Sequence, residues 1–283
     1  MRAVEIVSPG SLALVQDLGR PGYAHLGVPP SGALDVAALR LGNRLVGNPE
    51  DAAGIETVLG GLTVRAAVSC TAAVTGPPVA VTVDGRETGS HTPIPLRPGQ
   101  KLTIGRPASG LRCYLTVSGG IAVPPVLGSR STDVLSGLGP SPLEAGTRVP
   151  LGPVTGVPSG ADVVAAPPVP SQLTVPVVLG PRDDWFADPA STLNTQWTVT
   201  AESNRVGVRL DGPPLRRVST SELPSEGVLT GAIQVPPNGL PLVFLADHPT
   251  TGGYPVIAVV RRASLGALAQ ARPGTLVRFR ASL

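Results

Sequence analysis

Apolar residues occur along most of the chain in short runs that Gly, Pro and polar residues interrupt. Examples are the segments 4–7, 12–15, 173–179 and 277–280, each of which contains the β-branched residue Val. Between residues 54 and about 153, turn-forming residues recur roughly every 8 to 12 residues, a spacing typical of β-sandwiches and β-barrels. The pattern predicts a mainly β fold with a few short helices.

One segment, 33–46, has helical periodicity instead. Its apolar residues recur at spacings of three and four, which places them on one face of a helix: Leu34, Ala38, Leu41 and Leu45. Ser31 and Asp35 precede this face as helix-start residues, and the segment 47–49, G-N-P, ends it. A second, shorter helix is predicted near 263–270.

The segment 153–173 is rich in Pro and Gly and separates two stretches with strand patterns. Such a change in composition is typical of a domain boundary. We therefore expect an N-terminal β-barrel domain over 1–160 and a C-terminal β-barrel domain over 170–283.

Composition narrows the class of protein. Of the 283 residues, 42% are hydrophobic but only 3% are aromatic, so the core must consist mainly of Val, Leu, Ile and Ala. The net charge is +3 and the basic residues are scattered, which argues against a nucleic-acid partner. No apolar run approaches the roughly 18 residues of a membrane helix, and the N-terminus has no apolar signal segment. We expect a cytoplasmic protein that binds no membrane.

The sequence contains no motif for a common cofactor. There is no G-x-x-x-x-G-K-[ST] phosphate loop, and Lys101, the single lysine, lies in no biotin-attachment context. The three histidines lack the spacing of a metal site, so no metal is expected. Cys70 and Cys113 lie in apolar surroundings, where two reduced, buried thiols are expected and a disulfide is the alternative.

The segment 247–255, D-H-P-T-T-G-G-Y-P, connects two strongly apolar runs. The pair Gly252-Gly253 permits positive φ and close approach to a ligand, and successive N–H groups in such a turn can bind an anion. The pair Thr250-Thr251 adds hydroxyl donors. The segment is therefore either one wall of a ligand site or a hairpin turn against which Tyr254 packs.

Acidic and amide side chains lie near this segment in the sequence. Asp247 or Glu226 can act as a general base or orient an amide N–H of a ligand. Gln234 interrupts a strongly apolar run, as a ligand-binding residue or as a hydrogen-bonded residue of a strand. His248 is interpreted as a surface-loop residue, with a functional role as the alternative.

The first half contains weaker candidates. The segment 16–22, Q-D-L-G-R-P-G, is either a structural turn with a pair between Asp17 and Arg20 or part of a site. Ser31 has the same two interpretations. Arg130 and Arg205 lie in polar segments and are interpreted as solvated loop charges, with ligand binding as the alternative.

Several motifs occur in a characteristic order along the chain. They are S-P-G at 8–10, V-Q-D-L-G-R-P-G at 15–22, G-V-P-P-S-G-A-L-D at 27–35, N-R-L-V-G-N-P at 43–49, L-G-S-R-S-T-D at 127–133, N-R-V-G-V-R-L at 204–210, S-E-G-V at 225–228, G-A-I-Q-V-P-P-N-G at 231–239 and T-T-G-G-Y-P at 250–255. Together they span almost the whole chain. They resemble the KipA/PxpC family, also called allophanate hydrolase subunit 2 or biotin-dependent carboxyltransferase family.

This resemblance implies a fold of two cyclophilin-like β-barrel domains. It implies a subunit of an ATP-dependent 5-oxoprolinase, which converts 5-oxo-L-proline to L-glutamate and which is inactive as a single subunit. The partners would be a KipI/PxpB-like subunit and a PxpA/LamB-like subunit, and ATP would be bound mainly through them. One alternative is the carboxyltransferase module of a urea carboxylase, with carboxybiotin as a substrate that another chain carries. The other is a non-catalytic antagonist of a KipI-like kinase inhibitor.

Within this scheme the expected catalytic residues are Glu226, Asp247 and Thr251. The expected substrate-binding residues are Gln234, Thr250, Gly252, Gly253, Tyr254, Arg20 and Ser31. The chain departs from the usual pattern of the family at His248-Pro249 and at Val256, where a basic residue is usual. If that basic residue meets an anionic substrate, its absence is expected to weaken binding.

Overall fold

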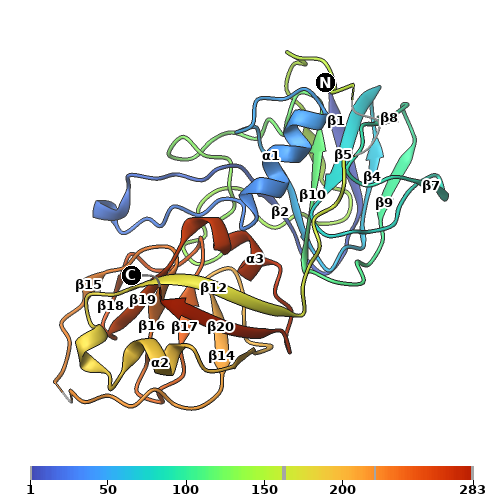
Figure 1. Ribbon diagram of the computed structural model, residues 1–283. Helices are drawn as coiled ribbons and strands as arrows, with labels where there is room; N and C mark the ends of the chain where they lie inside the picture. Colours follow the sequence, from blue (N-terminus) through green and yellow to red (C-terminus); the bar gives the residue numbers. More distant parts are fainter. Residues whose placement is uncertain (1, 161–163, 220, 282–283) are drawn as a thin grey trace. The chain divides into compact units, whose positions relative to one another are not determined.

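The computed structural model describes residues 2–160, 164–219 and 221–281. The chain divides into two compact units, shown in Figure 1. Unit 1 comprises Met1–Arg20, Ser31–Asp133 and Gly137–Val169, and unit 2 comprises Pro21–Pro30, Val134–Ser136 and Pro170–Leu283. The units thus interleave in the first half of the sequence, and the domain bounds 1–160 and 170–283 stay a prediction.

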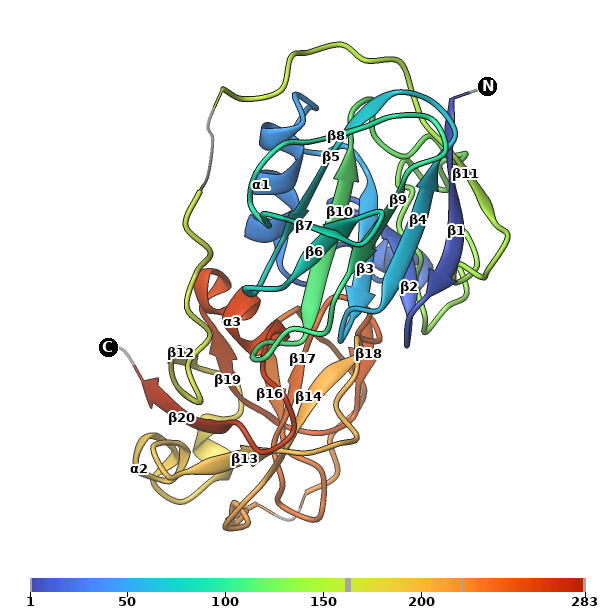
Figure 2. The same ribbon diagram turned by 90° about the vertical axis from the view of Figure 1, so that its right-hand side faces the viewer.

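Unit 1 is built on two antiparallel sheets, which overlap one behind the other in the view of Figure 2. The strands of the first sheet are β1 (Ala3–Pro9), β4 (Leu62–Ala66), β6 (Val81–Val83), β7 (Arg86–Thr88), β9 (Lys101–Ile104) and β11 (Arg148–Pro150), in the order β11-β1-β4-β9-β6-β7. The strands of the second are β2 (Ala13–Gln16), β3 (Gly54–Val58), β5 (Cys70–Thr75), β8 (Ile94–Leu96) and β10 (Arg112–Val117), in the order β2-β3-β10-β5-β8. Aliphatic side chains of both sheets, including Ile6, Val64, Ile55 and Leu115, form one buried core.

Helix α1 (Val36–Leu45) packs on β5 and β10 of the second sheet. Asp35 is its N-cap and accepts a hydrogen bond from the Ala38 N–H at 3.1 Å. The prediction of Ser31 as a helix-start residue is wrong. Ser31 has a φ of 51°, and its hydroxyl donates to the Thr132 carbonyl at 3.2 Å.

A buried polar cluster holds the start of α1 on the sheet. The Tyr114 hydroxyl donates to Glu56 Oε2 at 2.6 Å and accepts from the Asp35 N–H at 2.7 Å. The Leu34 N–H also donates to Glu56 Oε2, at 3.1 Å, and Arg112 Nε lies 3.6 Å from Glu56 Oε1. Burial raises the pKa of Tyr114 well above its ordinary value, and the charges of Glu56 and Asp35 raise it further, so the phenol stays protonated as a donor.

Unit 2 is a closed barrel of seven strands in the order β12-β19-β16-β17-β14-β13-β20. These strands are β12 (Gln172–Leu179), β13 (Trp197–Val199), β14 (Gly207–Asp211), β16 (Ala232–Gln234), β17 (Leu242–Phe244), β19 (Val256–Val260) and β20 (Leu276–Ala281). A separate two-stranded ribbon consists of β15 (Glu226–Gly227) and β18 (Thr251–Gly252). The described residues of the unit also form two short α-helices, α2 (Pro189–Leu193) and α3 (Leu265–Ala269), and three 3₁₀ helices, η1 (Ala24–Leu26), η2 (Asp183–Trp185) and η3 (Arg262–Ser264).

The structure confirms the mainly β fold and the short helix expected near 263–270, which is α3. The strands of unit 1 form two sheets, whereas the closed barrel belongs to unit 2. Cys70 and Cys113 are both buried and are not joined by a disulfide, as expected. Among the described residues, no helix is both long and apolar enough to cross a bilayer.

Replacing Tyr114 with Phe tests the polar cluster. The loss of the hydroxyl removes a partner from Glu56 and from the Asp35 N–H, so we expect the free energy of unfolding to fall by about 1–3 kcal/mol at pH 7. The raised pKa in the folded state also predicts that the wild type loses stability as the pH rises above about 10, where the unfolded tyrosine ionises. Y114F should lack that part of the pH dependence.

Urea unfolding followed by far-UV circular dichroism between pH 7 and pH 11 measures both effects. Y23F is the control, because Tyr23 is only partly buried. Equal pH slopes for Y114F and the wild type would show that Tyr114 does not contribute to alkaline stability.

Candidate functional site

The predicted loop 247–255 connects β17 to β19 in unit 2. Within it, β18 pairs antiparallel with β15, so that Glu226 lies opposite Gly252 and Gly227 lies opposite Thr251. The ribbon therefore brings the predicted acid Glu226 next to the predicted Thr and Gly residues, although more than twenty positions separate them in the sequence.

Glu226 forms an ion pair with Arg182, a residue that no sequence motif had indicated. Both side chains are about one-third exposed, at 34% and 33%. The Arg182 main-chain N–H donates to the Val256 carbonyl at 3.2 Å, and its guanidinium carbon lies 5.9 Å from the centre of the Trp185 ring. Arg182 thus places a positive charge beside position 256, where the resemblance implied that a basic residue was missing.

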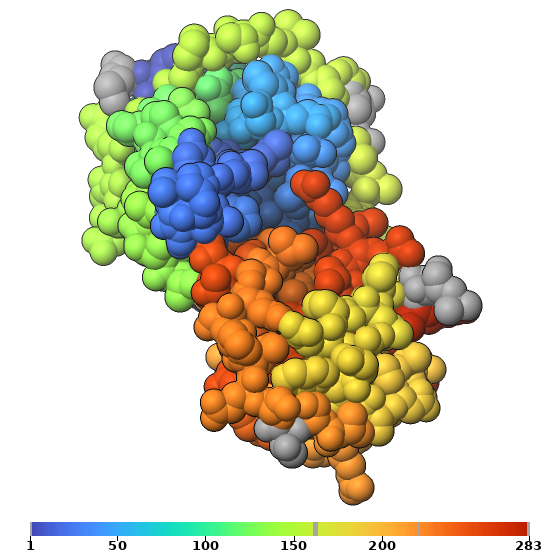
Figure 3. All heavy atoms as spheres, turned by 90° about the vertical axis from the view of Figure 1, so that its left-hand side faces the viewer, coloured from blue at the N-terminus to red at the C-terminus, as the bar shows by residue number. Residues whose placement is uncertain are grey.

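In Figure 3, yellow atoms of the part of unit 2 that includes the segment after β12 lie against orange atoms of later segments of the same unit. The sequence signal for Arg182 was only its position directly after Gly180-Pro181, at the end of a strand pattern. Its pairing with Glu226 joins positions 44 residues apart, which local patterns do not reveal.

Gln234 and Gly252 fit together closely. Gln234 is 4% exposed, and its Nε2 donates to the Tyr254 carbonyl at 3.0 Å. A Cβ at Gly252 would lie 2.5 Å from Gln234 Nε2. Among the described glycines, those with positive φ do not include Gly252 or Gly253, so that expectation was wrong. Gly252 is required here by close packing rather than by a left-handed conformation.

Asp247 lies at the start of the loop and is 0% exposed. Arg205, which is 2% exposed, donates from Nε to Oδ2 at 2.8 Å and from Nη2 to Oδ1 at 3.0 Å. The Val134 N–H donates to Oδ2 as well, at 3.1 Å. The interpretation of Arg205 as a solvated charge is therefore wrong, and these contacts favour a structural role for Asp247 over catalysis.

His248 is buried at 3% exposure, so its interpretation as a surface residue is wrong. Its Nδ1 donates to the Pro249 carbonyl at 2.7 Å, and its Nε2 lies 3.1 Å from the Thr230 hydroxyl. Its ring centre lies 5.7 Å from that of Phe244. The buried His248 side chain therefore holds the start of the loop in place.

The remaining loop residues are accessible. Thr251, Gly253 and Tyr254 are exposed, with Tyr254 at 44%, and Thr250 is partly buried. With Glu226 and Arg182 they form a set that carries one acid, one guanidinium, hydroxyls and main-chain groups. This set, which we call the ribbon site, can hold a small polar molecule with an anionic group.

Arg20 and Ser31, the two candidates from the first half, belong to unit 1. Arg20 is 1% exposed; its Nε donates to the Val126 carbonyl at 3.3 Å, and its Nη2 donates to the Ser131 carbonyl. Ser31 is 7% exposed and bonds to the Thr132 carbonyl. The structure thus uses both residues to hold the segment 126–132, in a different unit from the ribbon site.

The Asp17 carboxylate binds the same segment, through residues 129–131. Its oxygens accept hydrogen bonds from the Gly19 N–H at 2.8 Å, the Ser129 and Ser131 hydroxyls at 2.6 Å and the Arg130 N–H at 2.6 Å. The expected pair between Asp17 and Arg20 is replaced by these contacts and by the bonds from Arg20 to carbonyl groups. Arg130 is partly buried rather than fully solvated.

The part of the chain that the structure describes contains no group of three or more His, Cys, Asp or Glu residues that could hold a metal ion. The fold and the ribbon site define a class of protein. It is a chain of two β units whose barrel unit carries an acid, a hydroxyl and glycines on one short ribbon, with an arginine from another segment paired to the acid.

The sequence matches the family described as carboxyltransferase domain, subdomain A and B, over residues 26–281. The chain belongs to this family, and the resemblance inferred from the motifs is confirmed.

Relatives cover almost all of the chain. It is 39% identical to the C subunit of 5-oxoprolinase from Escherichia coli (strain K12), over 98% of this chain and 90% of that protein. It is 33% identical to the urea amidolyase of Saccharomyces cerevisiae, over 98% of this chain but only 16% of that protein. The crystal structure of TTHA0988 matches with a TM-score of 0.90 and 36% identity, over 99% of this chain. The chain corresponds to 56% of the TTHA0988 chain, so that chain is considerably longer.

Replacing Asp247 with Ala leaves Arg205 buried without its carboxylate. Breaking a buried pair in this way typically costs about 3–5 kcal/mol, so we expect a loss of that size in the stability of unit 2. Adding R205M should recover part of the loss. The exposed pair of Glu202 and Arg209 is the control, because E202Q should change stability by less than about 1 kcal/mol.

Both tryptophans, Trp185 and Trp197, belong to unit 2, so fluorescence during urea unfolding measures this unit directly. If D247A and E202Q had the same effect, the buried pair would not be a main determinant of barrel stability.

Replacing Gly252 with Ala tests the close contact with Gln234. The added methyl must displace the Gln234 amide from the Tyr254 carbonyl, at an expected cost of about 1–3 kcal/mol. Gly227 lies on the partner strand, and a Cβ there would meet nothing within 4 Å, so G227A is a matched control. Thermal unfolding of both variants checks the prediction, and equal stabilities would contradict it.

Proposed function

We propose that this chain is a subunit of an ATP-dependent 5-oxoprolinase, which converts 5-oxo-L-proline to L-glutamate. The observation that carries the proposal is the 39% identity to a protein named as the C subunit of 5-oxoprolinase, over 98% of this chain and 90% of that protein. A second relative of the same name, from Haemophilus influenzae, is 34% identical over 91% of its length.

The chemistry of the reaction fits the groups of the ribbon site. Amide resonance stabilises the lactam, and phosphorylation of its carbonyl oxygen by ATP would activate the carbonyl carbon toward water. Glu226 would act as the general base for that water. The Thr251 hydroxyl and the exposed main chain at Gly253 would stabilise the negative charge that develops.

Arg182 would bind the carboxylate of 5-oxoproline. Its guanidinium is one-third exposed, and its main chain is bonded to Val256, so its position next to the loop is fixed. In this scheme Arg182 has the role that the resemblance gave to a basic residue at 256. Asp247 would act indirectly, because its pair with Arg205 fixes the start of the loop.

Other subunits are part of the proposal. The sequence has no phosphate-binding loop, so ATP would be bound mainly by a KipI/PxpB-like or a PxpA/LamB-like partner. The chain would be inactive alone and would work with them in the cytoplasm.

A second candidate function is carboxyl transfer from carboxybiotin to an amide such as urea. It is favoured by the family description and by the 33% identity to a urea amidolyase, which corresponds to a small part of that protein. Biotin would be carried by another chain, because Lys101 is the single lysine here. Transfer of labelled carboxylate from carboxybiotin to urea by the assembled complex, without 5-oxoproline cleavage, would select this function.

The ribbon site can be tested in a complex of this chain with its two partners, by ATP-dependent glutamate formation. E226Q is expected to lower kcat roughly 100-fold, because a general base typically contributes 100-fold or more. T251V should lower kcat about tenfold or more through the loss of one donor. R182Q should mainly raise KM for 5-oxoproline.

E202Q and T198V are the controls, since both residues are in unit 2 and neither belongs to the ribbon site. Wild-type kinetics for all three ribbon variants in an active complex would exclude the site while leaving the overall function in place. Absence of glutamate formation by the wild-type complex would reject the proposed function itself.

A further inference from the structure

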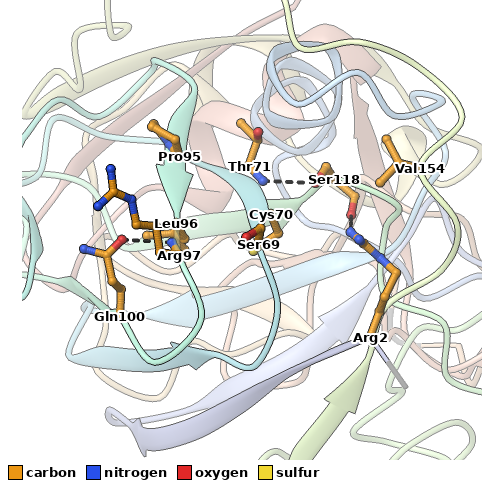
Figure 4. A pocket seen from close by; sticks show the side chains of 10 residues that line it. All are labelled: Arg2, Ser69, Cys70, Thr71, Pro95, Leu96, Arg97, Gln100, Ser118 and Val154. Carbon is orange, nitrogen blue, oxygen red and sulfur yellow. Dashed lines mark hydrogen bonds between the residues drawn. The ribbon is translucent and has the colours of Figure 1, made fainter.

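Unit 1 contains a cavity of about 610 Å³ whose described lining residues all belong to that unit. It lies where β5 begins and β8 ends, beside Ser118, which follows β10. Figure 4 shows Arg2 and Ser118 on one side of the cavity, Cys70 in the middle, and Arg97 with Gln100 on the other side. Its volume is in the range typical of small-molecule sites.

Hydrogen bonds to the main chain fix the walls of this cavity. The Thr71 N–H donates to Ser118 Oγ at 3.0 Å, and the Ser118 N–H donates to the Thr71 carbonyl at 2.8 Å. Cys70 lies opposite Leu96 in the ladder between β5 and β8. The Arg97 N–H donates to Gln100 Oε1 at 2.8 Å. The walls of the cavity are therefore already in place before a ligand binds.

The charge of the lining has one sign. Among the described residues that line the cavity are two arginines, Arg2 and Arg97, and no carboxylate. Asp84, the acid that contacts Gln100, accepts from Gln100 Nε2 at 3.0 Å and from the Lys101 N–H at 2.9 Å. Both of its oxygens thus already accept hydrogen bonds, and Asp84 does not line the cavity.

Arg2 has a donor that the described residues do not satisfy. Its Nη2 donates to the Ser118 carbonyl at 3.2 Å, whereas its Nε is buried and has no hydrogen-bond partner among the described residues. A buried donor without a partner costs about 1–3 kcal/mol. Because this Nε is buried, an acceptor from a ligand would remove this cost only if the Arg2 side chain shifted toward the cavity on binding. A carboxylate is well suited, because its two oxygens match the planar fork of a guanidinium.

We propose that this cavity binds a small dicarboxylate, with one carboxylate on Arg2 and the other on the side of Arg97. The hydroxyls of Ser69 and Thr71 lie between the two arginines as further polar groups, and Pro95, Leu96 and Cys70 contribute an apolar wall for the carbon chain. The proposal does not depend on the function proposed above, because it uses only residues of unit 1.

Succinate is the probe, with acetate and inorganic phosphate as the comparison anions, and calorimetry on the purified chain measures binding. Wild type is expected to bind succinate at least about tenfold more tightly than acetate or phosphate, since the second carboxylate of succinate would add a contact on the side of Arg97. R2Q and R97Q should each weaken succinate binding about tenfold or more. R106Q is the control, because Arg106 is an exposed arginine of unit 1 that does not line the cavity.

Cys70 supplies a second measurement that does not depend on the heat of binding. It lines the cavity at 9% exposure, whereas Cys113 is 0% exposed and does not line it. Burial raises the pKa of the Cys70 thiol, against a smaller opposite effect of Arg2, so labelling by a small neutral thiol reagent is measured at alkaline pH. Succinate should slow the labelling of Cys70 in the wild type and in R106Q, but not in folded R2Q or R97Q.

The proposal is overturned if succinate neither binds nor protects Cys70, or if R2Q and R97Q bind it as the wild type does. Phosphate that binds and protects as well as succinate would also overturn the dicarboxylate assignment. Thermal unfolding of each variant distinguishes a lost site from a lost fold.

Discussion

The buried ion pair between Arg205 and Asp247 is the contact on which the ribbon site depends. Two charges that are almost fully withdrawn from water are stabilised only when their geometry is good and their remaining hydrogen-bonding groups are satisfied. Here the carboxylate receives two bonds from the guanidinium and one from the Val134 N–H. Because Asp247 is the first residue of the loop, this pair determines where the loop leaves the barrel.

Beyond Asp247, buried hydrogen bonds fix the loop on its inner side, whereas the residues on its outer side are accessible to solvent. His248 bonds to Thr230 and to the Pro249 carbonyl, and Gln234 bonds to the Tyr254 carbonyl through the space that Gly252 leaves. The accessible groups are those on the ribbon. This division is typical of a surface whose geometry is determined by buried polar contacts, with its outer groups accessible.

In unit 1, as in unit 2, buried polar contacts hold the loops in place. Only 3% of the residues are aromatic, so its core is aliphatic, and its loops are held by carboxylate centres. Asp17 holds the segment 129–131, and Glu56 with Tyr114 holds the start of α1. The motifs around Asp17 and Arg20 therefore have a structural explanation in this unit, and the unit's cavity beside Arg2 is a separate feature of its sheet edge.

The sequence by itself determined the mainly β class, the helix over 36–45 to within a few residues, the family and the ribbon loop, because these depend on local periodicity and on ordered motifs. It could not distinguish Asp247 from Glu226 as the accessible acid, since burial depends on contacts with Arg205 and Val134 that lie far away in the sequence. It also could not find Arg182, whose partner is 44 residues distant, or the true reason for Gly252, which is the Gln234 side chain of a neighbouring strand. Only the tertiary structure decided these roles, because a side chain's exposure and partners are set by which strands pair and not by the residues next to it in the chain.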